Sequence, residues 1–330
     1  MKIRVGLIGT RRNKYGIGQF VAREVLNNSN ADLVAIMGTT PETVQQAITD
    51  LNKRQDVLNK FNGKTYVTDQ ADEFLKNIDL VIICSPKETH EDYIKKALTA
   101  NKHVLVEKPL IHNLKIPFEE RVKRSHDLMN IANKKKLFLS TNCQRAAAVY
   151  DLSEKLNLPS QPSSVNIELN ASSKGKNLET NEFLFDLLIA HPLSLLVKYG
   201  FTDFRSINVK DYSKQFSKQF NSNSSSLTIK GSYLQKSYKI TLQQTKEDSP
   251  ASMQIKLDDN PVVEITTENN DGKLRTKYTT KNSSFYSEDH LKICINKMVD
   301  TIYNSKEPLI TNDETYYIYT LQEKLRDLIH

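Results

Sequence analysis

Cysteine and long apolar runs are scarce in this chain. Its only three cysteines, Cys84, Cys143 and Cys294, lie far apart, and each sits in an apolar segment. The sequence therefore predicts neither a disulfide framework nor a zinc site, and we expect no metal ion. The N-terminal MKIRVGLIG has too short an apolar run for a signal peptide, and no segment reaches the ~18 apolar residues of a membrane span. We expect a soluble, cytoplasmic protein without a membrane partner.

Positive charge is in excess but is not concentrated. The chain has 46 Lys and Arg against 39 Asp and Glu, a formal net charge of +7. The lysines are scattered along helix-like stretches, and the longest run is only Lys134 to Lys136. A nucleic-acid groove would interleave basic and aromatic residues, which this sequence does not do. The composition therefore indicates a solvated basic surface and no nucleic-acid partner.

Residues 1–145 alternate between short apolar runs and longer stretches of helical period, and the chain of 330 residues is long enough for two domains. Strands that are apolar on both faces and separated by helices predict a parallel, doubly wound sheet with right-handed crossovers. We therefore assign residues 1–145 to a dinucleotide-binding Rossmann domain. The apolar runs are IRVGLIG, LVAIMG, TYVT, LVIICS, HVLVEK and LFLST, and the expected helices are 18–27, 41–61, 89–100 and 117–135.

Residues 146–330 have a different pattern of apolar and polar residues. Apolar and polar residues alternate, as at Val165, Ile167 and Leu169, and turn sequences such as Asp258-Asp259-Asn260-Pro261 separate the segments. This pattern predicts an α+β domain with an open, mainly antiparallel sheet, which has one face for a substrate and another for a partner subunit. One later segment has the spacing of an amphipathic core helix, at Leu291, Ile295, Met298 and Ile302.

A loop with three glycines follows the first predicted strand and opens a helix. A dinucleotide cradle needs one glycine for the tight turn, one where pyrophosphate approaches, and one where the helix packs on the strand. Gly9 and Gly18 can serve as first and last, but they lie nine positions apart instead of five, and Gly16 only approximates the middle one. The loop is either a nucleotide cradle or an ordinary glycine-rich turn. As a cradle it would use Gly9, Thr10, Arg11, Arg12, Gly16, Ile17 and Gly18, with further positive charge from Lys14.

No acid follows the second predicted strand, where an enzyme that prefers NAD usually has a carboxylate for the ribose 2′-hydroxyl. The chain has Gly38-Thr39-Thr40 there. Two hydroxyls and no acid would tolerate a 2′-phosphate paired with Arg11 or Arg12, which favours NADP slightly over NAD. The alternative is that Thr40 only caps the next helix, which would begin at Pro41.

Two more predicted strands are followed by C-S-P-K-E-T-H, Cys84–His90, and by E-K-P, Glu107–Pro109. The pattern S-P-x-x-x-H and then A-L-x-A-N-K-H-V-L-V-E-K-P-L resembles the signature of the glucose-fructose oxidoreductase, inositol dehydrogenase and rhizopine-catabolism family (Gfo/Idh/MocA). The resemblance continues in order over nearly the whole chain. It includes LFLSTNCQR at Leu137–Arg145, FDLLIAHPLSLL, and the turn KEPLIT at Lys306–Thr311.

The resemblance implies a role for each residue of EKP. Lys108 would hydrogen-bond the reacting hydroxyl or carbonyl oxygen, Glu107 would help to hold that site beside the cofactor, and Pro109, in a peptide bond that is often cis, would fix the turn. Hydride loss from a carbinol carbon requires a group that accepts the hydroxyl proton. A lysine between a nicotinium ring and other positive charge would have a lowered pKa. The alternative is an ordinary surface Glu-Lys pair before a turn proline.

Other contacts are implied in the same way. Ser85, Pro86 and His90 would help to hold the cofactor. Gln144 and Arg145, at the end of LFLSTNCQR, would bind the substrate.

The family also has a proton-handling aspartate and histidine four residues apart. The candidates here, Asp186 and His191, are five apart, and Ser194 replaces the family's acid three residues after the histidine. In a helix a spacing of five turns two side chains ~140° apart, whereas four leaves ~40°. Pro192 suggests a helix that begins near His191, after a looser segment that could still bring Asp186 to the substrate. The alternative for His191 is a satisfied buried histidine.

These observations predict an NAD(P)-dependent oxidoreductase that transfers a hydride between nicotinamide and a hydroxyl or keto carbon of a sugar, inositol or sugar nucleotide. Lys108 and His191 would together carry out the proton transfer. The stretched glycine loop and the altered Asp186–His191 spacing leave a second hypothesis open, a catalytically silent dinucleotide-binding sensor or regulatory scaffold of the same fold. The resemblance further implies a homodimer or homotetramer formed through the C-terminal sheet.

Overall fold

The computed structural model describes residues 2–10, 16–172, 188–202, 219–220, 224–245, 251–271 and 273–329. The chain forms two compact units. The first comprises Met1–Gln144 and Leu291–Tyr319, and the second comprises Arg145–His290 and Thr320–His330. The predicted division at residue 145 into cofactor and substrate domains stays a prediction.

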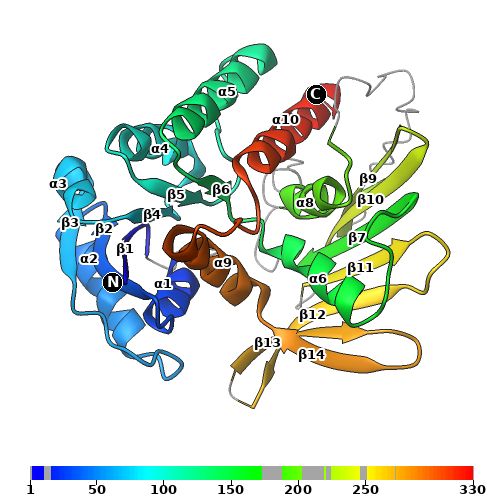
Figure 1. Cartoon of the computed structure of the whole chain (residues 1–330), viewed down its shortest axis with the longest axis horizontal. Coiled ribbons are helices and arrows are strands. Elements are labelled where there is room, and N and C mark those ends of the chain that lie inside the picture. Colours follow the sequence, from blue (N-terminus) through cyan, green and yellow to red (C-terminus); the bar gives the residue numbers. More distant parts are fainter. Residues whose placement is uncertain are drawn as a thin grey trace. The chain divides into compact units, whose positions relative to one another are not determined.

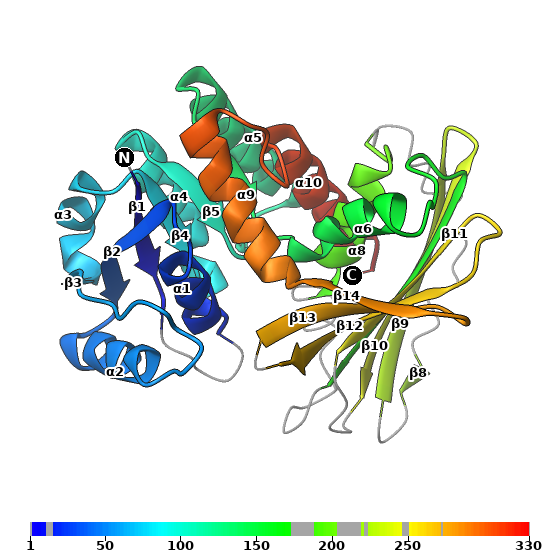
Figure 2. The same ribbon diagram turned by 60° about the horizontal axis from the view of Figure 1, so that its bottom comes forward.

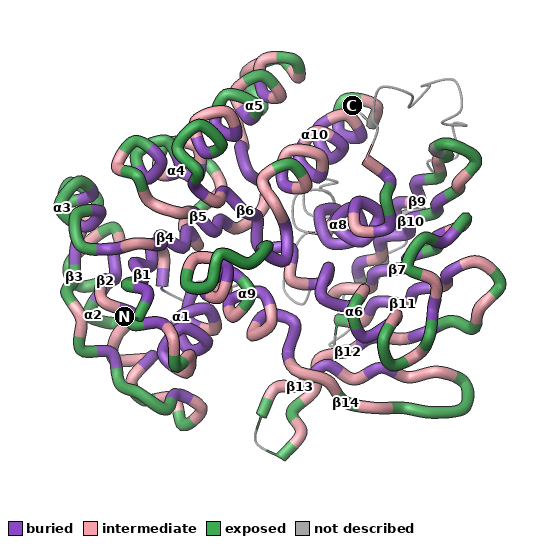
Figure 3. Tube along the Cα trace, in the orientation of Figure 1, coloured by how far each residue is buried: buried purple, intermediate pink, exposed green. Residues whose placement is uncertain are grey.

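The first unit is built on a six-stranded sheet in the order β3-β2-β1-β4-β5-β6, in which all pairings are parallel. Its strands are mostly buried, except the edge strand β3, because helices lie on both faces of the sheet (Figures 1 and 3). The doubly wound Rossmann fold predicted from the apolar runs is therefore confirmed. The strands are β1 Ile3–Ile8, β2 Ala31–Gly38, β3 Lys64–Val67, β4 Leu80–Ile83, β5 His103–Val106 and β6 Leu139–Thr141.

Three of the four helices predicted here, at 18–27, 89–100 and 117–135, begin and end within a residue of the predicted positions. The prediction for 41–61 was wrong at its C-terminal end, because α2 ends at Asn52. There the Asn52 side chain accepts a hydrogen bond from the Phe61 amide at 2.9 Å, which turns the chain back. The helices of this unit are α1 Gly18–Leu26, α2 Pro41–Asn52, α3 Ala71–Lys76, α4 His90–Thr99, α5 Phe118–Lys134 and α9 His290–Asn304, with short 3₁₀ turns at Thr68–Gln70 and Lys87–Thr89. Helix α10, Asn312–Ile329, belongs to this unit as far as Tyr319, and the 3₁₀ turn Gln144–Ala147 begins at the last residue of the N-terminal segment.

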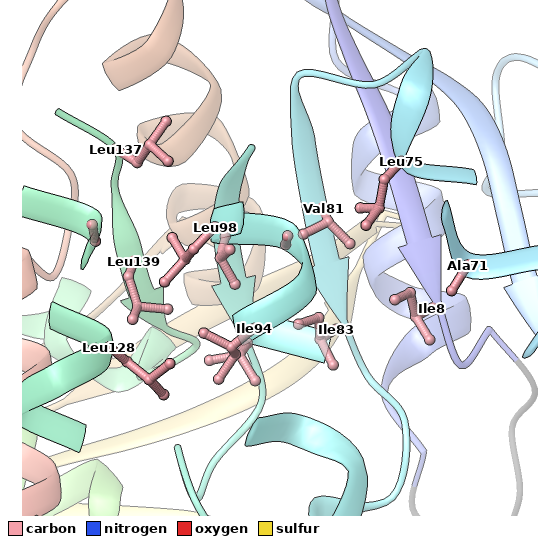
Figure 4. Packing of buried hydrophobic residues seen from close by; sticks show 14 of the residues in the cluster. Ile8, Ala71, Leu75, Val81, Ile83, Ile94, Leu98, Leu128, Leu137 and Leu139 are labelled. Carbon is pink, nitrogen blue, oxygen red and sulfur yellow. The ribbon is translucent and has the colours of Figure 1, made fainter. Parts of the chain in front are cut away.

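A continuous apolar core joins the sheet to helices α3, α4 and α5. Ile83, Ile94, Leu98 and Leu139 each expose 2% or less of their surface, and they face one another in Figure 4. Burial of side chains of this size contributes ~1.5–3 kcal/mol each to the hydrophobic term. The carboxyl ends of β4, β5 and β6 are therefore held on a rigid base.

The segment Leu291–Tyr319 also packs with this unit. The Asn312 side chain accepts from the Leu139 amide at 2.8 Å, and Tyr319 joins the apolar core. The predicted amphipathic helix at residues 291–302 is confirmed as α9.

The second unit contains an eight-stranded sheet in the order β14-β13-β12-β11-β7-β10-β9-β8. It is mainly antiparallel, as predicted, but β7 and β10 pair in parallel. Helices α6 Ala148–Glu154 and α8 Ala190–Lys198 lie over one face (Figure 2). The strands are β7 Ser164–Ser172, β8 Gln219–Phe220, β9 Ser224–Tyr233, β10 Lys236–Thr245, β11 Ser252–Leu257, β12 Val263–Asn270, β13 Lys273–Thr279 and β14 Ser284–Glu288.

The alternation in these strands separates an apolar face from a polar one. Val165, Ile167 and Leu169 are buried, whereas Asn166 and Glu168 between them are exposed or half-buried. Among the described helices none has the length and apolar character needed to cross a membrane.

Candidate functional site

The loops that follow four neighbouring strands of the first unit meet at one edge of the sheet. Backbone hydrogen bonds continue the ladder past the strand ends, from Cys84 N to Ile8 O at 2.8 Å and from Glu107 N to Ile83 O at 2.9 Å. Asn142 N donates to Val106 O at 2.7 Å in the same way. The segments that the sequence singled out after β1, β4, β5 and β6 therefore lie side by side.

The glycine loop has the geometry of a tight turn at Gly9, whose φ is +85°. A Cβ on Gly9 would lie 2.6 Å from the Cys84 carbonyl and the Ser85 nitrogen, and one on Gly18 would lie 2.2 Å from Gly9 O. Only glycine fits at either position. Arg11, Arg12 and Lys14 lie outside the described residues, as does Asp186.

Two features at the start of α1 leave hydrogen-bonding groups for a ligand. Ile17, at the N-cap position, provides no side-chain cap for the first amides of the helix. Thr10 is buried, and its hydroxyl has no partner among the described residues. Free amides at a helix N-terminus suit a phosphate group.

A hollow of about 390 Å³ lies beside this turn. Gly9, Thr10 and Gly16 line one part, Thr39 lies after β2, and Ser85 and Pro86 come after β4. Further lining comes from the apolar residues Ile36, Met37, Val44 and Ala47.

Thr40 is used by the helix that follows it. Its hydroxyl accepts from the Thr43 amide at 3.3 Å, and the Thr43 hydroxyl accepts from the Thr40 amide at 3.0 Å. These two bonds form a capping box, with Pro41 at the start of α2. The capping role of Thr40 is therefore confirmed, and its contact with a cofactor stays a prediction.

His90 lies under the loops and not at their surface, with 1% of its area exposed. Its Nδ1 is 2.8 Å from Pro109 O, and its Nε2 is 3.0 Å from Ser85 O. The ring thus joins the loop after β4 to the loop after β5. The direct contact with a cofactor predicted for His90 is not tested by these distances.

Glu107 and Lys108 form an ion pair in which Lys108 Nζ donates to Glu107 Oε2 at 2.9 Å. The side chains expose 9% of Lys108 and 15% of Glu107. Asn142 Nδ2 donates to the other oxygen of Glu107. The peptide bond between Lys108 and Pro109 is cis. This is an internal charged pair, unlike the ordinary surface pair that the sequence left as an alternative.

The pKa of Lys108 is raised, contrary to the expectation that it is lowered. Burial acts to lower it, but the charge of Glu107 and the hydrogen bond to its carboxylate outweigh that effect. The lysine is therefore an ammonium at neutral pH.

The cysteines surround this pair without adding charge to it. Cys84 and Cys143 lie near enough to affect Lys108. Burial raises the pKa of Cys143 to about 12, and burial also raises the pKa of Cys84 and Cys294. All three are free thiols, and no group of described residues is arranged to hold a metal ion.

In the second unit His191 is buried in the first turn of α8, which begins at Ala190. The helix start predicted near His191 is thus confirmed. Ser194 donates to His191 O at 2.7 Å. His191 belongs to the second unit and Lys108 to the first, and their predicted meeting stays a prediction.

Arg145 is buried beside a polar network in the same unit. Burial lowers the pKa of Arg145, and the nearby Asp289 and Tyr278 partly offset this effect. The Tyr278 hydroxyl is 2.8 Å from His290 Nε2. Arg145 Nη1 has no hydrogen-bond partner among the described residues, so this guanidinium keeps a donor for another group. Gln144 belongs to the first unit, and its buried Oε1 likewise has no hydrogen-bond partner among the described residues.

Asn142 was missed by the sequence analysis. Its contact with Glu107 places it in the site, and its exposed fraction is 2%. The signal was present, because Asn142 follows a predicted parallel strand directly and such positions gather at the ligand-binding edge.

A doubly wound sheet with a glycine turn and an internal Glu-Lys pair at its carboxyl edge defines a Rossmann domain. Residues 3–143 match a family model described as an oxidoreductase family with an NAD-binding Rossmann fold, GFO_IDH_MocA. Over these residues the chain is similar to the Gfo/Idh/MocA oxidoreductase family, and the resemblance seen in the sequence is confirmed there.

Known relatives are similar in sequence to this chain over part of their length. Inositol 2-dehydrogenase of Rhizobium meliloti is 32% identical over 110 residues, which are 33% of this chain and 29% of that relative. The match thus spans less than a third of the relative.

Solved structures extend the likeness of fold to the whole chain. UDP-N-acetylglucosamine 3-dehydrogenase GnnA from Acidithiobacillus ferrooxidans superposes with a TM-score of 0.69 at 15% identity, over 99% of this chain and 98% of that one. Scyllo-inositol dehydrogenase from Lactobacillus casei gives 0.68 at 13% identity, over 99% and 96%. At these identities the likeness concerns the fold alone.

Proposed function

We propose that the protein is an NAD(P)-dependent oxidoreductase that moves a hydride between nicotinamide and a CH–OH or keto carbon of a sugar, an inositol or a sugar nucleotide. The observation that carries this proposal is the internal Glu107–Lys108 pair, which lies at the same edge of the sheet as the glycine turn. The names of the relatives, inositol and UDP-sugar dehydrogenases, support the substrate class.

The first unit fits a dinucleotide. The start of α1, which Ile17 does not cap, and the Thr10 hydroxyl, which has no partner among the residues described, suit the pyrophosphate. Gly9 and Gly18 themselves carry no side chain toward it. The hollow lined by Thr39, Ser85 and Pro86 would take the adenosine end. When bound, the dinucleotide supplies or receives the hydride.

Lys108 would handle the proton. As an ammonium it can donate a proton to a carbonyl oxygen as that oxygen gains negative charge. In the opposite direction it must first lose its own proton, which a positive charge brought close to it would promote. Glu107 holds the ammonium in place, and Asn142 holds Glu107.

The second unit would supply the substrate contacts. Arg145, whose buried Nη1 has no partner in the described part of the chain, suits a hydroxyl, carboxylate or phosphate oxygen. Gln144, His191 and Asp186 complete the proposed set, with His191 and Asp186 as partners of Lys108 in the proton transfer.

We propose NADP over NAD as the cofactor because no acid stands at Thr39, and Arg11 or Arg12 could pair with a 2′-phosphate. A homodimer or homotetramer through the polar face of the second sheet, in the cytoplasm, completes the proposal.

The test is a spectrophotometric assay with NADH or NADPH and a panel of keto-sugars, keto-inositols and keto sugar nucleotides. The proposal expects oxidation of one reduced cofactor by at least one member of the panel. Tight binding of a dinucleotide with no turnover of any member would refute the proposed activity and support a silent sensor instead.

A further inference from the structure

We propose that His90 is a positioning residue that couples the dinucleotide loop at Ser85 to the Lys108 loop at Pro109 through one imidazole ring. The inference deepens the proposed function and rests on it. Its basis is that both ring nitrogens meet backbone carbonyls, one on each loop.

The protonation state of the ring decides how many of the two contacts can be hydrogen bonds. Carbonyl oxygens only accept hydrogen bonds, and a neutral imidazole has a single N–H. A neutral His90 can therefore donate to Pro109 or to Ser85, but not to both. Only the imidazolium donates to both carbonyls at once. The proposal places the N–H of the neutral ring on Nδ1, because the contact with Pro109, at 2.8 Å, is the shorter of the two.

The surroundings decide when the ring gains its second proton. Burial lowers the pKa of His90, whereas the two carbonyls, Glu107 and Glu88 act to raise it, and the net shift is downward. Glu88 is itself 3.6 Å from His112 Nδ1, and Glu107 carries Lys108. Near neutral pH the ring is therefore neutral and joined most firmly to the Lys108 loop, and acidification adds the bond to Ser85.

This arrangement has a consequence for both loops. Ser85 lines the hollow proposed for the dinucleotide, and Pro109 directly follows Lys108. A change at either carbonyl is passed to the other loop by a ring that is 99% buried and cannot swing into solvent. Small displacements of a catalytic group lower turnover strongly, by up to about 100-fold for ~1 Å.

Three substitutions separate the two bonds. The amide of Asn reaches about as far as Nδ1 of histidine and that of Gln about as far as Nε2. His90→Asn thus keeps a donor for Pro109, and His90→Gln keeps one for Ser85. His90→Leu keeps neither. We expect His90→Leu to lower kcat about 10–100-fold and to weaken dinucleotide binding. Relative to His90→Leu, His90→Asn should recover most of kcat, and His90→Gln should recover dinucleotide affinity more than kcat.

The matched control is His103, a half-buried histidine at the start of β5, whose Nδ1 accepts from the Phe138 amide at 3.1 Å. It stands at the amino end of the strand, away from the loops. His103→Leu should leave kcat and dinucleotide affinity within about twofold of wild type, after thermal melting has shown that every variant is folded.

A second measurement needs no turnover. NMR of ¹⁵N-labelled imidazoles should show the Nδ1–H tautomer of His90 at neutral pH and a pKa below the ordinary ~6.5. The backbone amides of Ser85 and Leu110 should titrate with the same midpoint as the ring. This result would support the coupling even if the protein turned over no member of the substrate panel, an outcome that would instead refute the proposed function.

Three results would overturn the inference. One is a wild-type kcat and dinucleotide affinity in folded His90→Leu. Another is that His90→Asn and His90→Gln, both folded, lose as much as His90→Leu in each measurement. The third is that the Ser85 and Leu110 amides do not respond when His90 titrates.

Discussion

Replacement of Gly9 by alanine tests the cradle, and a second glycine of the chain provides a matched control. Gly9 and Gly200 both have a φ of +85°, so alanine at either position is forced into the left-handed region, which costs ~1–2 kcal/mol. Their surroundings differ. A Cβ on Gly9 would lie 2.6 Å from the backbone of Cys84 and Ser85, whereas the nearest described atom to one on Gly200 is Lys236 Nζ at 3.7 Å.

The difference in surroundings sets the expected magnitudes. Gly200→Ala should lose only the conformational ~1–2 kcal/mol of unfolding free energy. Gly9→Ala should lose a further ~1–3 kcal/mol, because backbone atoms must move to admit the methyl group. The same movement displaces Ser85 and the turn, so dinucleotide binding should be lost while the protein remains folded.

The assay is urea unfolding of both variants, followed by fluorescence titration with NADPH and NADH. Gly200→Ala should bind the dinucleotide as wild type does. Equal destabilisation of the two variants, or an unchanged affinity in Gly9→Ala, would refute the assignment of the loop as a cradle.

Two further predictions concern cofactor choice and acid stability. Thr39→Asp should shift the ratio of NADP and NAD dissociation constants toward NAD by ~1–3 kcal/mol, through repulsion of a 2′-phosphate, and an unchanged ratio would mean that Thr39 does not face the ribose. Burial acts to raise the pKa of Asp79, but hydrogen bonds from Arg4 outweigh it and lower that pKa. A carboxylate with a lowered folded-state pKa stabilises the protein above its unfolded pKa of ~3.9 and loses that contribution as the pH falls below it. Because the Arg4 side chain is 45% exposed, Asp79→Asn should cost only ~0.2–1 kcal/mol at pH 7 and less near pH 3, as measured by urea unfolding, and a larger loss near pH 3 would contradict the sign.

The sequence predicted the first sheet well because each apolar run had to be buried on both faces. Runs such as LVII at Leu80–Ile83 fit only a central parallel strand. The end of α2 could not be predicted in this way, because the Asn52 side chain stops the helix by bonding to Phe61, nine residues later. The parallel pairing of β7 with β10 was equally inaccessible, since alternation has the same period in either strand direction.

In the candidate site, too, the features that depend on contacts between distant residues could not be predicted from the sequence. Glu107, Lys108 and Pro109 could be found by their position after a strand and by the family signature. The hydrogen bond from Asn142 and the raised pKa of Lys108 depend on distances between loops that are far apart in the sequence. His90 was found by the signature, but only the structure shows that both of its nitrogens face carbonyls.

The most direct test of the proposed activity is the turnover of Lys108→Met with whichever substrate and cofactor the panel identifies. The lysine stands on the loop after β5, away from the glycine turn, so the variant should bind the dinucleotide nearly as well as wild type. Its kcat should fall roughly 10²–10⁴-fold, the usual contribution of a positioned acid or base. An undiminished kcat in Lys108→Met would contradict the mechanism.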